Sequence, residues 1–289
     1  VYHHVGPQDT SLRRSLTQSI RTSRSMQSSQ SFTAAVLAGS RAGVDPVAEV
    51  AGAPCKAVVE VAGEAMLLRV LRALSRATAV GPLVVAGLAD EAAEDPVIRA
   101  GLNAFGARRV PGRSSPASTV SSVLDGTPAD TPVLVTTADH ALLETGMVDA
   151  FLAGAMKTGA DVAIGLAREE MVFAVAPDTR RTVSRFRDGG YCGTNLFAFL
   201  TPTGRQAVDF WRHIEANRKS PARMVRTLGP LTLLRYVTRR LTLSAALDRL
   251  SALSGARVAP VILPFGRAAI DVDKPEDLEL ARRLAGSSD

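Results

Sequence analysis

Short apolar runs separated by amphipathic segments organise the chain from residue 32 onwards. Unbroken runs cover 32–38, 83–86 and 258–264, and another ends at Asp139. Short continuous runs of this kind are typical of parallel strands buried on both faces. A further short strand is predicted at 107–110. Helices are predicted from the spacing of Met66, Leu67, Val70, Leu71 and Leu74 and from the polar-faced segment 91–105.

The middle of the chain changes to shorter β-type segments, which favour antiparallel pairing. They are predicted at 161–167, 172–176 and 182–186, and a glycine-rich stretch at 188–199 follows. Residues 205–257 return to helical spacing, with apolar positions at Leu231, Leu234, Val237, Leu241, Leu243, Leu247, Leu250 and Leu253. The whole pattern predicts an α/β fold with a Rossmann-like, doubly wound mixed sheet and a helical insertion in the C-terminal third.

Residues 1–25 differ from everything after them, with four arginines among many serines and a single acid, Asp9. Such a segment cannot bury enough apolar surface to offset the entropy of ordering, so we predict disorder. We therefore divide the chain into a leader at 1–30 and a domain at 31–289. The leader is either an Arg/Ser-rich targeting peptide or an artificial or over-extended start upstream of Met26, and we favour the second.

Composition excludes several classes of protein. Residues 205–257 carry eleven lysines and arginines against three acids, but aromatic content is 4% and no RNA-binding or zinc-finger motif occurs, so no nucleic-acid partner is expected. No apolar run approaches the roughly 20 residues that cross a bilayer. Cys55 and Cys192 are too few for a disulfide framework or a zinc site, so a cytoplasmic location is expected.

A glycine-bearing turn after the first apolar run is a candidate phosphate site. Gly39 and Gly43 allow backbone N–H groups to approach a phosphate, and Arg41 and Lys56 supply positive charge. A P-loop is excluded because only three residues separate these glycines and Val44 follows the second. The dinucleotide fingerprint G-x-G-x-x-G is also absent.

Two segments around this turn resemble the MobA-like nucleotidyltransferases. They are Leu37-Ala38-Gly39-Ser40-Arg41-x-Gly43 and the stretch from Pro54 through Lys56 to Val61-x-Gly63-x-x-Met66-Leu67. Relatives include molybdenum-cofactor guanylyltransferase, the cytidylyltransferase of isoprenoid synthesis and the sugar-phosphate nucleotidyltransferases. The resemblance implies nucleotide contacts from Leu37, Ala38, Gly39, Ser40 and Gly43, and catalytic roles for Lys56 and Arg41 on the phosphates. The chain departs from the family at Ser40, where a second glycine is usual, and in the longer spacer 44–53.

Two later segments extend the resemblance towards the nucleotide and its metal. A Gly/Ser loop that contains Gly112 and Ser118 opens a helix and resembles the second nucleotide loop of the family; the alternative is ordinary helix capping. Asp139 ends an apolar strand, where ligands of open α/β sheets bind. Family members bind Mg²⁺ through an aspartate at this point. The alternative role for Asp139 is a cap for the helix starting near Glu144, and His140 is expected to be a neighbour rather than a ligand.

The closing stretch Asp271-x-Asp273-Lys274-Pro275-Glu276-Asp277-Leu278 resembles the last motif of the family. Pro275 is expected to start a helix, with Asp273 just before its first turn. In many relatives an acid or amide here completes the metal site, so the resemblance implies Mg²⁺ held by Asp139 and Asp273. Mg²⁺ is usually bound by one or two carboxylates, with phosphates and waters as the remaining ligands.

Three residues of the glycine-rich stretch, Gly193, Thr194 and Asn195, are candidate contacts to the acceptor substrate, because the corresponding strand lines the acceptor pocket in the family. A hairpin turn supported by Asn195 is the equal alternative. Cys192 has no histidine at a recognisable spacing, so we do not expect a cysteine nucleophile.

The sequence therefore predicts an Mg²⁺-dependent nucleotidyltransferase that uses GTP or CTP and a phosphorylated small-molecule or lipid-linked acceptor. The alternatives are a metal-dependent glycosyltransferase of GT-A type and a catalytically silent nucleotide-binding regulator. The basic insertion 205–257 is either a solvated face, a surface that attracts an anionic acceptor, or a peripheral membrane contact. The sequence does not fix the oligomeric state.

Overall fold

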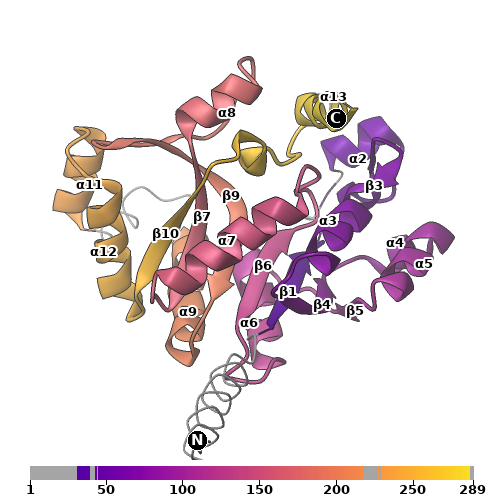
Figure 1. The fold of residues 1–289 in the computed structure, drawn as a ribbon, viewed down its shortest axis with the longest axis horizontal. Coiled ribbons are helices and arrows are strands. Elements are labelled where there is room, and N and C mark those ends of the chain that lie inside the picture. The colour runs from indigo at the N-terminus through magenta and orange to yellow at the C-terminus, as the bar shows by residue number, and fades with distance from the viewer. Residues whose placement is uncertain (1–30, 40–42, 44, 218–226, 228, 287–289) are drawn as a thin grey trace, which may run out of the picture. The chain divides into compact units, whose positions relative to one another are not determined.

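The computed structural model describes residues 31–39, 43, 45–217, 227 and 229–286, and these form an α/β fold around one mixed sheet (Figure 1). The strand order is β10-β7-β9-β6-β1-β4-β5, and β8 pairs with β9. This confirms the predicted doubly wound mixed sheet. The strands are β1 (Phe32–Leu37), β4 (Val80–Ala86), β5 (Arg108–Val110), β6 (Val133–Thr137), β7 (Val162–Arg168), β8 (Ser184–Phe186), β9 (Gly189–Phe199) and β10 (Val258–Leu263). A separate two-stranded sheet pairs β2 (Glu60–Val61) with β3 (Glu64–Ala65).

The unbroken apolar run at the start of the domain forms the central strand β1. It pairs in parallel with β4 on one side and β6 on the other, and its first five residues are buried. Both faces are covered by helices, so no position of the strand needs to be polar. Two bonds continue the ladders beyond the strand, from Ala38 N to Ala86 O and from Ala138 N to Leu37 O. These bonds hold the carboxyl ends of the three strands at one edge of the sheet.

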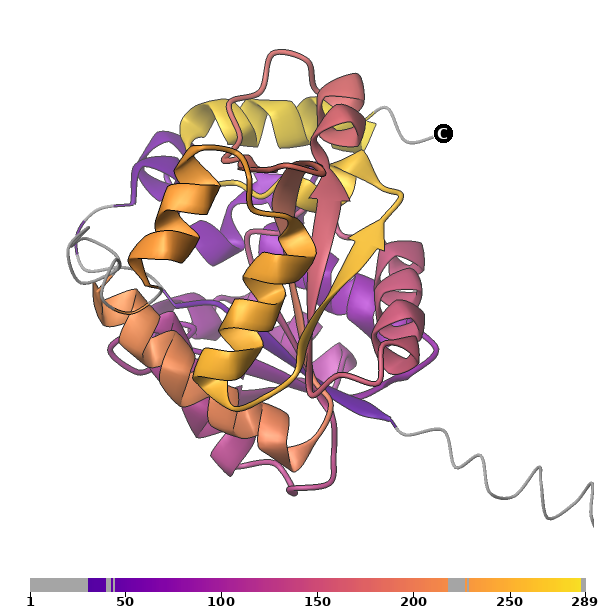
Figure 2. The ribbon, with the colours of Figure 1, turned by 90° about the vertical axis from the view of Figure 1, so that its left-hand side faces the viewer.

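Helices cover both faces of the sheet, as Figure 2 shows with the sheet seen from its side. One face packs against α3 (Met66–Ser75), α5 (Pro96–Ala104) and α7 (Thr145–Lys157), which share one core cluster. The other face packs against α6 (Pro116–Asp125) and α9 (Pro202–Asn217). The predicted helical spacing from Met66 to Leu74 is confirmed, because those residues are the buried face of α3.

Two predicted elements are wrong. The segment 91–105 is not one helix but α4 (Asp90–Glu94) and α5. Asp95 precedes Pro96 and has a non-helical backbone, and it caps the second helix by accepting from Val97 N and Ile98 N. The segment 172–176 is not a strand; it ends α8 (Glu169–Val175). Val172 is the buried residue of α8 and packs in a small cluster with Ala167 and Cys192, a contact that local alternation does not encode.

The antiparallel strand β9 joins the two parallel parts of the sheet. It runs antiparallel to β6 and β7, and β7 pairs in parallel with β10. The register between β7 and β9 shifts opposite Gly165, and Asn195 there has a φ of 51°. Asparagine tolerates this left-handed conformation better than most residues, so it can occupy the irregular position in the strand. A hairpin turn occurs at Arg187 and Asp188, between β8 and β9, but the predicted turn supported by Asn195 is wrong, because Asn195 lies within β9 and hydrogen-bonds to Asp271.

The insertion is helical, as predicted, and begins three residues before the predicted boundary, with α9 at Pro202. Its other described helices are α11 (Pro230–Val237) and α12 (Leu243–Ser254). The chain closes with α13 (Pro275–Gly286), which packs against α2 (Pro46–Ala51). No described helix is both long enough and apolar enough to span a lipid bilayer. The predicted leader, 1–30, lies outside the described residues.

Candidate functional site

A cavity of about 820 Å³ lies at the carboxyl ends of β1, β4, β5 and β6. Each of these strands contributes its last residues or the loop that follows it, so the cavity lies where open α/β sheets bind ligands. The lining residues are Leu37, Ala38, Gly39, Gly43, Asp45, Pro46, Lys56, Ala57, Ala86, Gly87, Gly112, Arg113, Ser114, Ser115, Pro116, Thr119, Thr137, Ala138, Asp139, Glu215 and Asp273.

Three glycines from three different strand ends meet in this cavity, and we call them the glycine floor: Gly39, Gly87 and Gly112. Gly87 has a φ of 83°, and a Cβ atom on it would lie 3.1 Å from the Cα of Gly39 and 3.3 Å from the Cα of Gly112. Only glycine fits this left-handed position at such close approach. Gly87 was not predicted from the sequence, although it directly follows the apolar run 83–86.

The first loop contributes Leu37, Ala38, Gly39 and Gly43 to the cavity wall. Gly43 has a φ of 105°, which is also a glycine conformation. Asp45 caps α2 by accepting hydrogen bonds from Val47 N and Ala48 N. Two predicted site residues, Ser40 and Arg41, lie outside the described residues.

The acidic end of the cavity is the group Lys56, Asp139 and Asp273. Lys56 Nζ lies 2.5 Å from Asp139 Oδ2 and 3.4 Å from Asp273 Oδ1. Thr137 orients Asp139 by donating its hydroxyl to Oδ1 at 2.5 Å. Burial disfavours the charge of Lys56, but the negative field of Asp139, the hydrogen bond to it and the field of Asp273 outweigh burial and raise the pKa of the ammonium group. Lys56 is therefore a fixed cation between two carboxylates.

The closing segment, residues 270–277, is fixed beside Asp139 by several long-range contacts. Val272 N donates to Asp139 O at 3.0 Å. The buried guanidinium of Arg181 bonds to Asp271 and, at 3.1 Å, to Asp277 Oδ1. Asp277 also accepts from Asp273 N and Lys274 N, in the manner of a capping box at the start of α13. These contacts determine where Asp273 lies, and the role of Arg181 was not predicted from the sequence.

The carboxyl group of Asp271 responds to the negative charge of this region. Burial raises the pKa of its carboxyl group, the charges of Asp139 and Asp273 raise it further, and Arg181 opposes them. Among the described residues no three His, Cys, Asp or Glu side chains are grouped to hold a metal ion by themselves. Two carboxylates that already converge on one cation are a donor set that fits Mg²⁺ shared with substrate phosphates. The predicted alternative for Asp139 does not hold, because Glu144 occupies the cap position of α7.

The loop end of the cavity is formed by residues 112–119 and Glu215. Ser115 caps α6 by accepting from Ser118 N, and Thr119 Oγ1 accepts from Arg113 N at 2.9 Å. Ser118, a predicted nucleotide contact, hydrogen-bonds to Ser115 and does not line the cavity. Glu215 reaches this end from α9, and its Oε2 accepts from Ala117 N at 3.3 Å. Glu215, which belongs to the helical insertion, was not predicted from the sequence as a site residue.

The predicted acceptor residues Gly193, Thr194 and Asn195 lie on β9 outside the lining of the cavity. Gly193 is exposed and Thr194 is buried. Asn195 contacts the closing segment instead, because its Nδ2 donates to Asp271 Oδ2 at 2.7 Å. Burial raises the pKa of the neighbouring Cys192 thiol, which keeps it protonated and a poor nucleophile.

His140 is buried behind the acidic end, with Nδ1 at 3.5 Å from Thr136 Oγ1. Burial lowers the pKa of its imidazole to about 4, so the ring is neutral near pH 7. It does not line the cavity.

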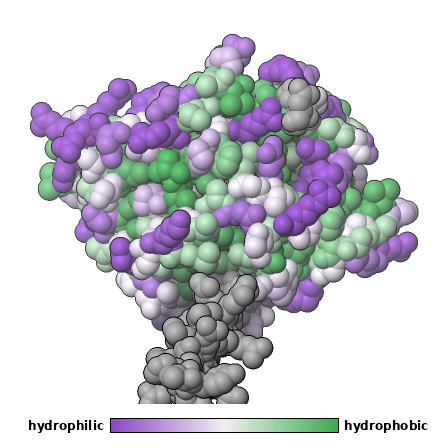
Figure 3. Space-filling model, in the orientation of Figure 1, coloured by the Kyte–Doolittle hydropathy of each residue, from purple (hydrophilic) through white to green (hydrophobic). Residues whose placement is uncertain are grey.

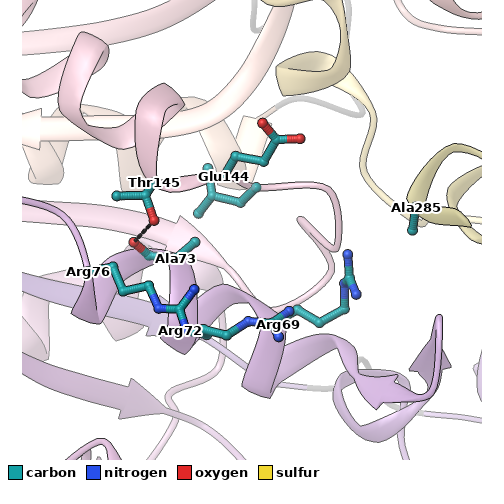
Figure 4. Close-up of a pocket in the computed structure, with 8 residues that line it drawn as sticks. Arg69, Arg72, Ala73, Arg76, Glu144, Thr145 and Ala285 are labelled. Atoms are coloured by element: carbon teal, nitrogen blue, oxygen red, sulfur yellow. Dashed lines mark hydrogen bonds between the residues drawn. The ribbon is translucent and has the colours of Figure 1, made fainter. Parts of the chain in front are cut away.

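A second cavity, of about 340 Å³, lies between α3 and the start of α7 (Figure 4). Two of its three arginines hold other parts of the protein: Arg69 Nε donates to Ala141 O at 2.9 Å, and Arg72 pairs with Glu64 at 2.5 Å. It shares no lining residue with the larger cavity. Because Arg69 and Arg72 of this second cavity bind other parts of the protein, we place the candidate active site in the larger cavity.

Comparison with known proteins gives one family and several structural neighbours. A family model described as MobA-like NTP transferase domain matches residues 34–263. No curated protein matches the sequence. A solved structure of a hypothetical transferase from Thermus thermophilus is similar at 28% identity, over 86% of this chain and 99% of the other, with a TM-score of 0.72.

Two more distant structures share the fold. One is 4-diphosphocytidyl-2C-methyl-D-erythritol synthase from Anaerococcus prevotii, at 13% identity over 91% of this chain and 99% of the other, with a TM-score of 0.57. The other is a CMP:2-keto-3-deoxy-manno-octonic acid synthetase complexed with CTP, at 16% identity over 88% and 98%, with a TM-score of 0.51.

Proposed function

Because the chain belongs to the family of MobA-like NTP transferase domains, we propose that it transfers a nucleoside monophosphate group from GTP or CTP to a phosphorylated acceptor. The observation that carries the proposal is the position of Lys56 between Asp139 and Asp273, at strand ends beside the glycine floor. A triphosphate needs a cation, backbone that allows close approach, and acidic groups for a metal. All three are supplied within one cavity.

An oxygen of the acceptor phosphate would attack the α-phosphorus, the bond from that phosphorus to the bridging oxygen would break, and pyrophosphate would leave. Lys56 neutralises phosphate charge, and the loop after β1 supplies backbone N–H groups; Arg41 belongs to the same proposal. Asp139 and Asp273 would hold Mg²⁺, which supplies further charge neutralisation at the phosphate oxygens when bound. No protein nucleophile is required.

Glu215 favours guanine over cytosine as the base. Along the order β6-β1-β4-β5, the loop end lies three strands from Asp139, or roughly 14 Å, which suits a nucleoside whose phosphates lie at the acidic end. A carboxylate at the loop end would repel phosphates and would accept hydrogen bonds from a base. Guanine presents two adjacent donors, N1–H and the 2-amino group, which match the two oxygens of a carboxylate, whereas the Watson–Crick edge of cytosine presents one donor, the 4-amino group, beside two acceptors. We therefore favour GTP.

The acceptor would be a small phosphate ester or a lipid-linked phosphate. Gly193, Thr194 and Asn195 belong to the proposal as acceptor contacts, supported by the bond from Asn195 to the closing segment. A cytoplasmic location is likewise part of the proposal.

The test measures binding first and turnover second. The melting temperature of the purified protein is recorded with each of the four triphosphates, with and without Mg²⁺, and pyrophosphate release is then measured with a panel of phosphate monoesters and a polyprenyl phosphate. We expect stabilisation by GTP with Mg²⁺ and release with at least one acceptor. Stabilisation only by nucleotide sugars would indicate the glycosyltransferase, and binding without any release across the panel would favour the regulator.

A further inference from the structure

Helix α11 exposes three large aliphatic side chains in eight residues. Leu231, Leu234 and Val237 are 67%, 60% and 71% exposed. Elsewhere in the described chain, large exposed apolar residues occur singly, one each on α2, α5, α7, α8 and β10. Single exposed apolar residues need no explanation, but a cluster on one helix does.

The orientation of α11 is fixed by contacts on its other side. Tyr236 packs edge-on against Phe186, with ring centroids 5.6 Å apart. After the helix, Arg239 adopts a φ of 56°, and the chain returns so that the buried Leu241 accepts a hydrogen bond from Arg187 N at 2.8 Å. The aliphatic stripe therefore faces outwards as a consequence of packing, the reverse of the usual arrangement in a surface helix.

The same surface is positively charged. Arg187, Arg235, Arg239 and Arg240 are exposed, and none of them belongs to an ion pair among the residues that the structure describes. From Gly229 to Leu247 the sequence contains no acid. At the margin of the molecule where Figure 1 places α11, Figure 3 shows strongly hydrophilic residues beside hydrophobic ones.

We propose that the α11 surface, formed by Leu231, Leu234, Val237 and these four arginines, docks on a membrane that contains anionic lipids. A lipid interface accepts an apolar stripe in its acyl boundary and pairs arginines with headgroup phosphates at the same depth. A second copy of the chain would oppose arginine with arginine across a two-fold axis. A nucleic acid would leave the leucines without a partner, since its bases stack on aromatic rings.

The experiment is co-sedimentation of the full chain with vesicles of phosphatidylcholine alone or mixed with phosphatidylglycerol, at low and high salt. The apolar variant is Leu231→Ser, Leu234→Ser and Val237→Ser; the charge variant is Arg235→Gln, Arg239→Gln and Arg240→Gln. All six side chains are exposed, so circular dichroism should show folded variants. The matched control is Val97→Ser with Met156→Ser, which removes exposed apolar side chains from α5 and α7.

We expect the wild type to bind the anionic vesicles only, with weaker binding at high salt, and each α11 variant to bind at least tenfold more weakly. The control should bind like the wild type. The proposal is overturned if the wild type does not bind anionic vesicles at low salt, or if the apolar variant binds as tightly as the wild type. A wild-type dimer in light scattering that the apolar variant dissociates would show instead that this surface joins two copies.

Discussion

The two ends of the candidate cavity are built in different ways. At the glycine floor and the loop end, the decisive features are backbone ones: glycines after strands, and a helix start capped by Ser115. At the acidic end they are side chains brought together from positions 56, 139, 181, 195 and 271–277. Apart from Glu215, the first end depends on backbone conformation and on the close approach of three loops, whereas the second depends on charged side chains from distant parts of the chain. Substitutions at the two ends should therefore impair the protein in different ways.

The largest effect is expected at the acidic end from Asp139→Asn. The amide still accepts from Thr137 but loses the charge that Lys56 and Mg²⁺ would meet, so pyrophosphate release should fall by about 10²–10³-fold. Circular dichroism should show an unchanged fold. Asp248→Asn on α12, remote from the cavity lining, is the control and should keep full turnover. Full turnover of Asp139→Asn would remove this residue from the site.

Arg181→Met tests whether the acidic end depends on the closing segment. Its guanidinium side chain is 8% exposed and pairs with Asp271 and Asp277, so its removal leaves buried carboxylates without a partner. We expect a loss of about 3 kcal/mol in the free energy of unfolding, measured by urea titration. Turnover should fall at temperatures where the variant is still folded, because Asp273 loses its support. A variant with wild-type stability would show that the segment is held by its other contacts alone.

Gly87→Ala tests the glycine floor. The new methyl group needs a left-handed backbone and meets Gly39 and Gly112, so we expect a loss of about 1–2 kcal/mol in stability and weaker binding of triphosphate. Gly146→Ala on α7 is the matched control: nothing lies within 4 Å of its Cβ position, and alanine favours the helix by about 0.5–1 kcal/mol. Equal melting temperatures for both variants would contradict the close approach of the three loops.

Glu215→Gln should have the smallest effect and the most selective one. The wild type should use GTP about tenfold better than ITP, which lacks the 2-amino group, because one charged hydrogen bond is lost. The variant should lose that preference while its ITP kinetics change little. Asp209→Asn, an exposed change on the same helix, should keep the preference. If the wild type prefers CTP, guanine recognition by Glu215 is wrong while the nucleotidyltransferase proposal stands.

Elements whose residue pattern lies within a single segment of the sequence were predicted best. The parallel strands, the apolar run that ends at Asp139 and the proline that starts α13 follow from local patterns, and the structure contains all of them. It also places Lys56 Nζ within hydrogen-bonding reach of Asp139 Oδ2 and of Asp273 Oδ1, three residues that the resemblance singled out.

Features that depend on contacts between residues far apart in the sequence were not predicted. Arg181 is one arginine among many until Asp271 and Asp277 fold onto it. Glu215 is one of three acids in the basic insertion, and its place at the cavity follows only from the packing of α9 against α6. Val172 was misassigned for the same reason, because its burial comes from contact with Cys192 and Ala269 rather than from local alternation.

The hydrogen bond from Val272 to Asp139 has a consequence for the order in which the protein folds. The glycine floor joins strand ends 48 and 25 residues apart along the chain, whereas Asp273 reaches Lys56 across 217 residues, and we expect the contact of longer range to form later. A folding chain can thus shape the floor before the closing segment docks. Refolding followed by stopped flow would separate the two events as an early recovery of triphosphate binding and a later recovery of turnover.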